Sequence, residues 1–331
     1  MIFGERVTPK YDRRRTRDSF PKEIVIHERM QTPPPKDDVV GIHLDLGDLE
    51  LWRIDTSDLV SYRLLAKGAH GEVWIGEYKA IKKLLANEQT AQGIQKFIDE
   101  IKLTTKLDSP FITKFIGASW LRPREMELVM EYMENGDLRN YLETTKESTK
   151  FPWKQKVQCI QDICDGLVYL HSLHVIHRDL KSRNVLLGVN LEAKLTDFGI
   201  SREISNETMT HGVVGTYRWI APEILQGDRY TVAADIYSFG VILSEFDSHS
   251  IPYHGALNEK GLPLTEITLL NLVRDGAIKP YYTNKCLPWV YELAMQCLET
   301  DPSKRPKAPE IAAYLRRNIR QAQFDHQLSG L

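Results

Sequence analysis

The sequence predicts an α+β protein in which a β-rich first part precedes a mainly helical second part. The first part contains short strand-like runs at residues 51–54, 61–67, 72–75, 78–85, 113–116 and 128–133. In the second part, apolar residues recur at helical spacing over 157–170, 233–246 and 264–273. Because strands and helices are segregated along the chain, an α+β architecture is favoured over alternating βα units.

One helix is expected within the β-rich part. Its apolar residues recur at positions i, i+3, i+4 and i+7, and they are Ile94, Phe97, Ile98 and Ile101. Glu100 lies in the same stripe as Phe97, so it can face the sheet. Lys82 ends an apolar strand, where a lysine is costly without an anionic partner. An isolated glutamate on a helix is more commonly exposed, so the expected Lys82–Glu100 pair depends on the motifs of the second part.

Composition excludes several classes of protein. The chain has 331 residues, of which 42% are hydrophobic and 27% charged, so it is neither fibrous nor wholly disordered. A formal net charge of −2 argues against nucleic-acid binding by bulk electrostatics. We expect no membrane span and no secretory signal, because no apolar run is long enough. The four cysteines are too few for a disulfide framework, and we expect reduced thiols and a cytoplasmic location.

The two ends of the chain differ from its middle. Residues 1–47 hold an arginine cluster at 13–17 and three consecutive prolines, which is typical of a flexible tail. The cluster could serve nuclear import or bind phosphate, although a solvated tail is favoured. We expect a β-rich lobe at 48–134, a helical lobe at 135–320 and a frayed tail at 321–331.

Five ordered motifs carry the chemistry. They are His177-Arg178-Asp179-Leu180-Lys181-Ser182-Arg183-Asn184, Asp197-Phe198-Gly199, Gly215-Thr216-Tyr217-Arg218-Trp219-Ile220-Ala221-Pro222-Glu223, Asp235-Ile236-Tyr237-Ser238-Phe239-Gly240 and Asp301-Pro302-Ser303-Lys304-Arg305-Pro306. From about residue 58 to 317, the chain resembles the eukaryotic protein kinases. It is similar to the tyrosine-kinase-like group, serine/threonine type. This resemblance implies the two-lobed kinase fold, with a small β-rich N-lobe and a larger, mainly helical C-lobe.

The resemblance implies roles for individual residues in phosphoryl transfer from ATP. Asp179 would orient the substrate hydroxyl and accept its proton, and Lys181 would neutralise the transferred phosphate. Lys82, held by Glu100, would contact the α- and β-phosphates. Two metal ligands are implied for Mg²⁺, with Mn²⁺ as an alternative, and they are Asn184 and Asp197.

The same resemblance implies a nucleotide pocket. A loop containing Ala66, Gly68 and Gly71 would cover the triphosphate. The remaining pocket residues implied are Val73, Ala80 and Leu186 around the base, Met130 at the gatekeeper position, Glu131 and Met133 at the adenine edge, and Asp137 at the ribose. Glu223 and Arg305 would form a buried structural pair, and Asp235 would brace the catalytic loop.

Two departures from the family pattern leave a second reading open. Ala66 stands where the family usually has glycine, and the hairpin before Lys82 is short. We expect Val73 to pair with Ala80, which leaves Gly76-Glu77 as a two-residue type II′ turn. These departures motivate a nucleotide-binding pseudokinase or scaffold module as the alternative to an active enzyme. A small-molecule kinase is disfavoured by the motif at 215–223, which resembles a peptide-substrate platform.

Lys181 favours serine/threonine specificity, with dual specificity as an alternative. The expected partners are ATP and protein substrates in intracellular signalling, without nucleic acid. The activation segment also holds four hydroxyl residues, Ser201, Ser205, Thr208 and Thr210. We expect an upstream kinase to act on Thr208 or Thr210, with Arg178 pairing with the phosphate.

Overall fold

In the computed structural model of the chain, the described residues are 44–67, 71–76, 79–198, 202–203 and 217–324. Several predicted features lie outside the described residues. They are the arginine cluster at 13–17, Gly68, Glu77, Gly199, Ser201, Ser205, Thr208, Thr210, and Gly215 with Thr216.

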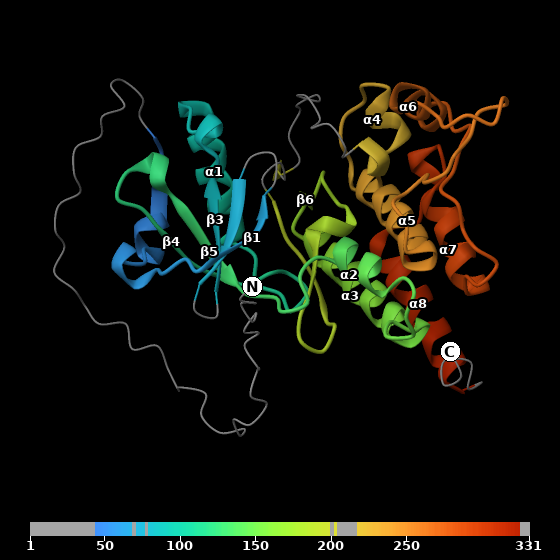
Figure 1. Cartoon of the computed structure of the whole chain (residues 1–331), viewed down its shortest axis with the longest axis horizontal. Helices are drawn as coiled ribbons and strands as arrows, with labels where there is room; N and C mark the ends of the chain where they lie inside the picture. The colour runs from blue at the N-terminus through green and yellow to red at the C-terminus, as the bar shows by residue number, and fades with distance from the viewer. Residues whose placement is uncertain (1–43, 68–70, 77–78, 199–201, 204–216, 325–331) are drawn as a thin grey trace, which may run out of the picture. The chain divides into compact units, whose positions relative to one another are not determined.

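Five antiparallel strands form the N-terminal sheet, in the order β1-β2-β3-β5-β4 (Figure 1). The strands are β1 (Arg63–Lys67), β2 (Gly71–Ile75), β3 (Lys79–Leu84), β4 (Phe115–Ser119) and β5 (Glu127–Glu131). The sheet confirms the β-rich first part that the sequence predicts.

Helix α1 (Ala91–Thr104) is the main helix of this part, and Figure 1 shows it beside β3. Thr90 caps its first turn by accepting a hydrogen bond from Gly93 N at 3.1 Å. All four residues of the predicted apolar stripe are buried, and they pack with Leu128 and Met130 of β5. The helix therefore presents its buried face, and with it Glu100, to the sheet.

The strand predicted at residues 51–54 is wrong. Residues Gly47–Trp52 form a 3₁₀ helix, in which Leu49 is the buried residue and Leu51 is 81% exposed. Arg53 alone follows the expected pattern, as an isolated bridge to Ala118. The prediction fails because Leu49 is the residue of this segment that is buried in the core, whereas the apolar side chains after it are not.

The predicted register of the β2–β3 hairpin is also wrong. Val73 pairs with Lys82, not with Ala80, and Ile75 pairs with Ala80. Gly76 N donates to Lys79 O at 2.8 Å, so Gly76 continues the pairing of the two strands. Glu77, the second residue of the predicted turn, lies outside the described residues. A Cβ at Gly76 would lie 2.9 Å from Val60 O, so the close approach of this carbonyl, not a turn, requires glycine. Because the register shifts by two residues, Val73 and Ala80 still share one face.

The second part of the chain is mainly helical. Its helices are α2 (Leu138–Thr145), α3 (Trp153–Ser172), α4 (Pro222–Leu225), α5 (Val232–Ser248), α6 (Glu266–Arg274), α7 (Pro288–Cys297) and α8 (Ala308–Phe324). Its short strands are β6 (Val175–Ile176), β7 (Val185–Leu187), β8 (Ala193–Leu195) and β9 (Arg202–Glu203). β7 pairs with β8 and β6 with β9, both antiparallel.

Helix α5 is the centre of this part. Its residues 234–246 are all buried, as expected of a helix surrounded by protein on every side. It packs on α3 and α7, and Figure 1 shows it between α4 and α7. The four cysteines are free, as predicted, and Cys286 is the one that is only half-buried. The two parts together form the bilobal kinase fold that the resemblance implies.

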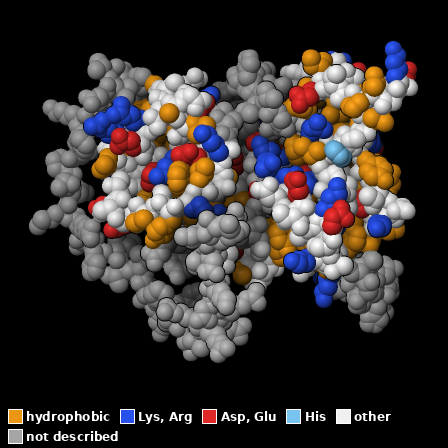
Figure 2. All heavy atoms as spheres, viewed as in Figure 1, with side chains coloured by type: hydrophobic (Ala, Val, Ile, Leu, Met, Phe, Trp, Pro, Cys, Tyr) orange, Lys and Arg blue, Asp and Glu red, His pale blue; other side chains and the backbone are white. Residues whose placement is uncertain are grey.

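Two properties of the molecule bear on its partners. None of the described helices is both long and apolar enough to cross a membrane. On the face shown in Figure 2, Lys and Arg side chains are interspersed with Asp and Glu. No field of a single sign therefore extends over the described surface of that face.

Candidate active site

Lys82 lies between two carboxylates. Its Nζ is 2.5 Å from Glu100 Oε1 of α1 and 2.8 Å from Asp197 Oδ1, which follows β8. Burial alone would lower the pKa of Lys82, but Asp197 and Glu100 together raise it above its ordinary value. The structure thus forms the predicted Lys82–Glu100 pair. It also brings Asp197, a residue distant in sequence, to the same ammonium group.

Asp197 is held in an unusual backbone conformation. Its φ is 65°, a left-handed value that is uncommon for residues other than glycine. Burial opposes ionisation, but the ammonium of Lys82 lowers the pKa of Asp197 to about 2. The next residue, Phe198, is buried with its ring centroid 5.3 Å from that of His177. The carboxylate is therefore ionised at neutral pH and is anchored by its buried neighbour.

Three predicted residues of the catalytic loop form one cluster. Lys181 Nζ lies 2.6 Å from Asp179 Oδ2, and Asn184 Nδ2 donates to the same oxygen at 3.0 Å. Asn184 Nδ2 also donates to Asp179 O at 2.8 Å. Asp179 Oδ1 is buried and has no hydrogen-bond partner within the described part of the chain. A buried acceptor of this kind is costly unless a ligand completes it.

Asp235 at the start of α5 holds the beginning of the catalytic loop. Its Oδ2 accepts hydrogen bonds from His177 N at 2.9 Å and its Oδ1 from Arg178 N at 3.0 Å. His171 Nε2 lies 2.9 Å from the same Oδ2. Although burial alone would raise the pKa of Asp235, His171 and His177 lower it, so the carboxylate stays charged. Arg178 has a φ of 66°, a left-handed value that is strained for a residue other than glycine. The hydrogen bonds to Asp235 offset this strain.

Glu223 and Arg305 form the predicted buried pair. Arg305 Nη1 and Nη2 donate to the two oxygens of Glu223 at 2.7 and 2.6 Å. Arg305 Nη1 also donates to Ala233 O at 2.8 Å. This bidentate arrangement fixes α4 to the loop before α8 and to the start of α5.

The residues predicted around the base come together on the sheet. Ala80 of β3 pairs with Met130 of β5, and both are buried. Val73 is half-buried on the same face of the sheet as Ala80. Leu186 of β7 is half-buried and forms an isolated bridge with Asp137. The roles of these residues in binding a base stay predictions.

Two further predicted residues have structural partners, and a third is buried. The Glu131 carboxylate accepts hydrogen bonds from Lys194 Nζ at 2.7 and 2.8 Å, so its side chain is engaged within the protein. Asp137 caps α2 by accepting from Asn140 N at 2.9 Å. Met133 is buried. If the predicted ribose contact forms, the Asp137 carboxylate both caps α2 and binds the ribose.

The described part of the predicted phosphate loop consists of its flanks. Ala66 is exposed and pairs with Val73 between β1 and β2. A Cβ at Gly71 would lie 2.7 Å from Lys83 O. Gly71 is therefore required by the close approach of β3, whatever else it contacts.

The donor set at this site fits magnesium. Mg²⁺ is usually held by one or two carboxylates together with substrate phosphates, rather than by a cage of protein ligands. Asp197 provides an ionised carboxylate whose side chain is 43% exposed, and Asn184 provides an amide oxygen. Within the described ranges, no three His, Cys, Asp or Glu side chains form a cluster suited to a metal. A site of one carboxylate and one amide is compatible with that finding.

Sequence analysis missed one buried charged cluster. Arg139 of α2 donates to Glu245 of α5, and both side chains are buried. A glutamate inside the apolar run 234–246 is the signal that could have indicated it.

Comparison with known proteins identifies the family. A family model described as protein tyrosine and serine/threonine kinase matches residues 59–315. The chain therefore belongs to the protein kinase family.

Its relatives include kinases from plants and from an amoeba. The chain is 35% identical over 277 residues to the serine/threonine/tyrosine-protein kinase HT1 of Arabidopsis thaliana. It is 32% identical over 270 residues to the serine/threonine-protein kinase STY46 of the same plant, and 33% over 279 residues to the probable serine/threonine-protein kinase drkA of Dictyostelium discoideum. These matches include 81%, 80% and 82% of this chain. They span 68%, 45% and 41% of the respective relatives.

Proposed function

We propose that the chain is an active protein serine/threonine kinase that transfers the γ-phosphate of ATP to protein hydroxyls in intracellular signalling. The observation that carries this proposal is the convergence of Lys82, Glu100 and Asp197 in one ion-pair network. Losing any of these groups would lower the rate by orders of magnitude. Their joint presence favours catalysis over a purely structural role.

Asp179 is the residue that we assign to accept the proton of the substrate hydroxyl. Its Oδ2 already accepts hydrogen bonds from Lys181 and Asn184, whereas its Oδ1 is buried without a described partner. Oδ1 is therefore the atom assigned to the hydroxyl. Lys181, whose Nζ contacts the other oxygen, would neutralise charge on the phosphoryl group during transfer.

Asp197 and Asn184 are the residues assigned to the metal, and Lys82 to the α- and β-phosphates. When bound, Mg²⁺, or Mn²⁺ in its place, would neutralise the negative charge of the phosphates. Lys82 carries one positive charge between two carboxylates, so the trio has an excess negative charge. That excess favours a divalent cation beside Asp197.

The nucleotide would lie against the face of the sheet that Val73, Ala80 and Met130 share. Ala80 provides little side-chain volume there, which leaves room for a planar base. The flanks of the phosphate loop, Ala66 and Gly71, come from β1 and β2 of the same sheet.

Serine and threonine are the favoured acceptor residues, because Lys181 occupies the position characteristic of that class. Dual specificity is the alternative, supported by the similarity to HT1, whose name includes tyrosine. The proposal includes activation by an upstream kinase at Thr208 or Thr210, and action in the cytoplasm. Nuclear import through the arginines at 13–17 is a further alternative.

The test is phosphate transfer from Mg·ATP to a generic basic protein and to the chain itself, followed by phosphoamino-acid analysis. We expect phosphoserine or phosphothreonine, and a loss of about a thousandfold in the Asp197→Ala variant. A wild-type chain that binds Mg·ATP but transfers no more phosphate than the variant would instead support the nucleotide-binding scaffold that Ala66 motivates.

A further inference from the structure

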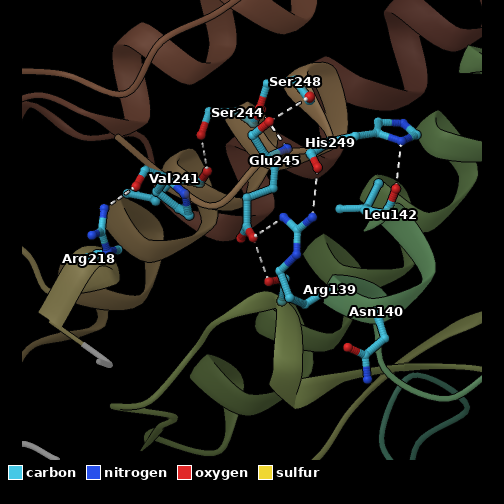
Figure 3. Close-up of polar contacts among 12 residues, drawn as sticks. Arg139, Asn140, Leu142, Arg218, Val241, Ser244, Glu245, Ser248 and His249 are labelled. Atoms are coloured by element: carbon cyan, nitrogen blue, oxygen red, sulfur yellow. Dashed lines mark hydrogen bonds and ion pairs between the residues drawn. The ribbon is translucent and has the colours of Figure 1, made fainter. Parts of the chain in front are cut away.

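A buried carboxylate outside the proposed catalytic site accepts hydrogen bonds from three segments of the chain. Glu245 lies on α5 with no exposed surface. Its Oε1 accepts from Ser182 Oγ at 2.7 Å and from Arg139 Nη1 at 3.1 Å, and its Oε2 accepts from Trp219 Nε1 at 2.8 Å. Figure 3 shows Glu245 and Arg139 facing each other across α5 and α2. Both oxygens of the carboxylate are thus engaged.

Two of these donors come from segments beside the proposed chemistry. Ser182 directly follows Lys181 in the catalytic loop and lies two positions before Asn184. Trp219 ends the 3₁₀ turn at Tyr217–Trp219, just before the Ala221–Glu223 motif that resembles the peptide-substrate platform. One carboxylate therefore connects the loop that would hold the hydroxyl to the segment that would hold the peptide.

The third donor adds a charged partner to the connection. Arg139 places a positive charge beside Glu245, and its Nη2 donates to His249 O at 2.7 Å, at the end of α5 (Figure 3). Burial raises the pKa of Glu245 to about 7, while hydrogen bonds from Ser182 and Trp219 oppose that rise. Each donor stabilises the charged form of Glu245. Loss of one donor therefore weakens the hydrogen bonds that the other donors make to this carboxylate.

We propose that Glu245 is a positioning residue that couples the catalytic loop, through Ser182, to the peptide-side segment, through Trp219. This inference rests on the proposed kinase function and deepens it. It assigns the alignment of the acceptor hydroxyl with Asp179 to a side chain that touches neither substrate. Alignment errors of about 1 Å can lower a rate by about a hundredfold, so a hydrogen-bonded hub at this place affects turnover.

Two mild substitutions test the coupling without leaving a buried charge alone. Ser182→Ala removes one donor to Oε1, and Trp219→Phe removes the donor to Oε2 while keeping an aromatic ring. Glu245 itself is not substituted, because its removal would leave the buried charge of Arg139 without its carboxylate. Ser244→Ala is the matched control, since Ser244 is a buried serine of the same helix whose Oγ bonds to Val241 O of α5 (Figure 3).

Hydrogen exchange by mass spectrometry provides a readout that does not depend on activity. We expect Trp219→Phe to raise exchange in the peptide covering 177–184, and Ser182→Ala to raise it in the peptide covering 217–225. Ser244→Ala should change neither peptide. If each substitution raises exchange only around its own position, the coupling is refuted, whatever the phosphate-transfer assay shows.

Steady-state kinetics provides the second readout. We expect Ser182→Ala to lower kcat about tenfold or more with an unchanged KM for ATP, and Trp219→Phe to raise the KM for the peptide as well. The double variant should lose less than the product of the two single losses, because both act through Glu245. Fully multiplicative losses would overturn the proposal. A wild-type chain without transfer would instead contradict the kinase function, and the exchange result would still decide the coupling.

Discussion

The ammonium of Lys82 is the residue-scale feature on which the proposed chemistry depends. Its charge is retained in a largely buried position because Glu100 and Asp197 lie within 2.8 Å of it. Glu100 lies on α1 and pairs with the Lys82 ammonium at 2.5 Å, so we expect its effect on the rate to act through the position of Lys82. A substitution at Glu100 therefore separates the positioning of Lys82 from its presence.

We expect Glu100→Gln to lower kcat/KM for ATP by about a hundredfold, because a neutral amide holds the Lys82 ammonium less firmly than a carboxylate and leaves Asp197 as its charged partner. Asp99→Asn is the matched control, since Asp99 is the exposed neighbour on the same helix. Steady-state kinetics with varied ATP measures both variants. Equal kcat/KM values in Glu100→Gln and the control would show that the Lys82–Glu100 pair does not contribute to catalysis.

His249 predicts a pH dependence of stability. It is buried at the end of α5 with a φ of 51°, and its Nδ1 lies 2.9 Å from Leu142 O. Burial lowers the pKa of His249 to about 4, against an ordinary value of 6.5. Between these values the unfolded state binds more protons than the folded state. The contribution of His249 to stability is therefore present above pH 6.5 and is lost as the pH falls towards 4.

The measurement is urea unfolding of the wild type and of His249→Asn between pH 7 and 4.5, since asparagine tolerates the left-handed backbone. Over this range the wild type should lose about 2–3 kcal/mol more than the variant. Parallel curves for the two proteins would show that His249 titrates normally in the folded state.

At the scale of elements, helix α5 organises the second part of the molecule, and its contact with α7 depends on Gly240. A Cβ at Gly240 would lie 2.9 Å from Cys297 Cβ and 3.0 Å from Leu298 Cγ. Helix propensity alone would make Gly240→Ala stabilising by about 1 kcal/mol. Because these neighbours are buried and packed, we expect the variant to be destabilised by about 1–3 kcal/mol. The midpoint of urea unfolding measures the difference, and an unchanged or higher midpoint would contradict the close packing.

Elements with a strong local pattern were predictable from the sequence. The stripe of α1 buries its residues as expected, and Glu100 of the same helix pairs with Lys82. The β2–β3 register was mispredicted because Gly76 was assigned to the turn, whereas the carbonyl of Val60 approaches it closely from outside the hairpin. The apolar run around Glu245 indicates a buried carboxylate but not its partners, since the donors come from α2, the catalytic loop and the turn at Tyr217–Trp219. Contacts between distant segments have no signature in local spacing.

At the scale of the whole molecule, the proposed site draws on both lobes. Lys82 belongs to β3 of the N-terminal sheet, whereas Asn184 ends the 3₁₀ helix Ser182–Asn184 and Asp197 follows β8, both in the helical part. A ligand that contacts all three would add free energy that the unfolded chain lacks. Global stability is therefore sensitive to occupancy of a site that only the folded state assembles.

We expect Mg·ATP to raise the melting temperature of the full chain. At a free concentration of about 100 times Kd, linkage adds about 2.7 kcal/mol to the free energy of unfolding. For a domain of this size that corresponds to roughly 5 °C. Chelation of the metal should reduce the shift, because uncompensated phosphate charge would then face Asp197.

Asp197→Asn should respond to ATP with little dependence on Mg²⁺, whereas Asp99→Asn should behave as the wild type. An equal metal-dependent shift in Asp197→Asn would show that the cation does not bind at this carboxylate. The absence of any shift in the wild type would contradict nucleotide binding itself.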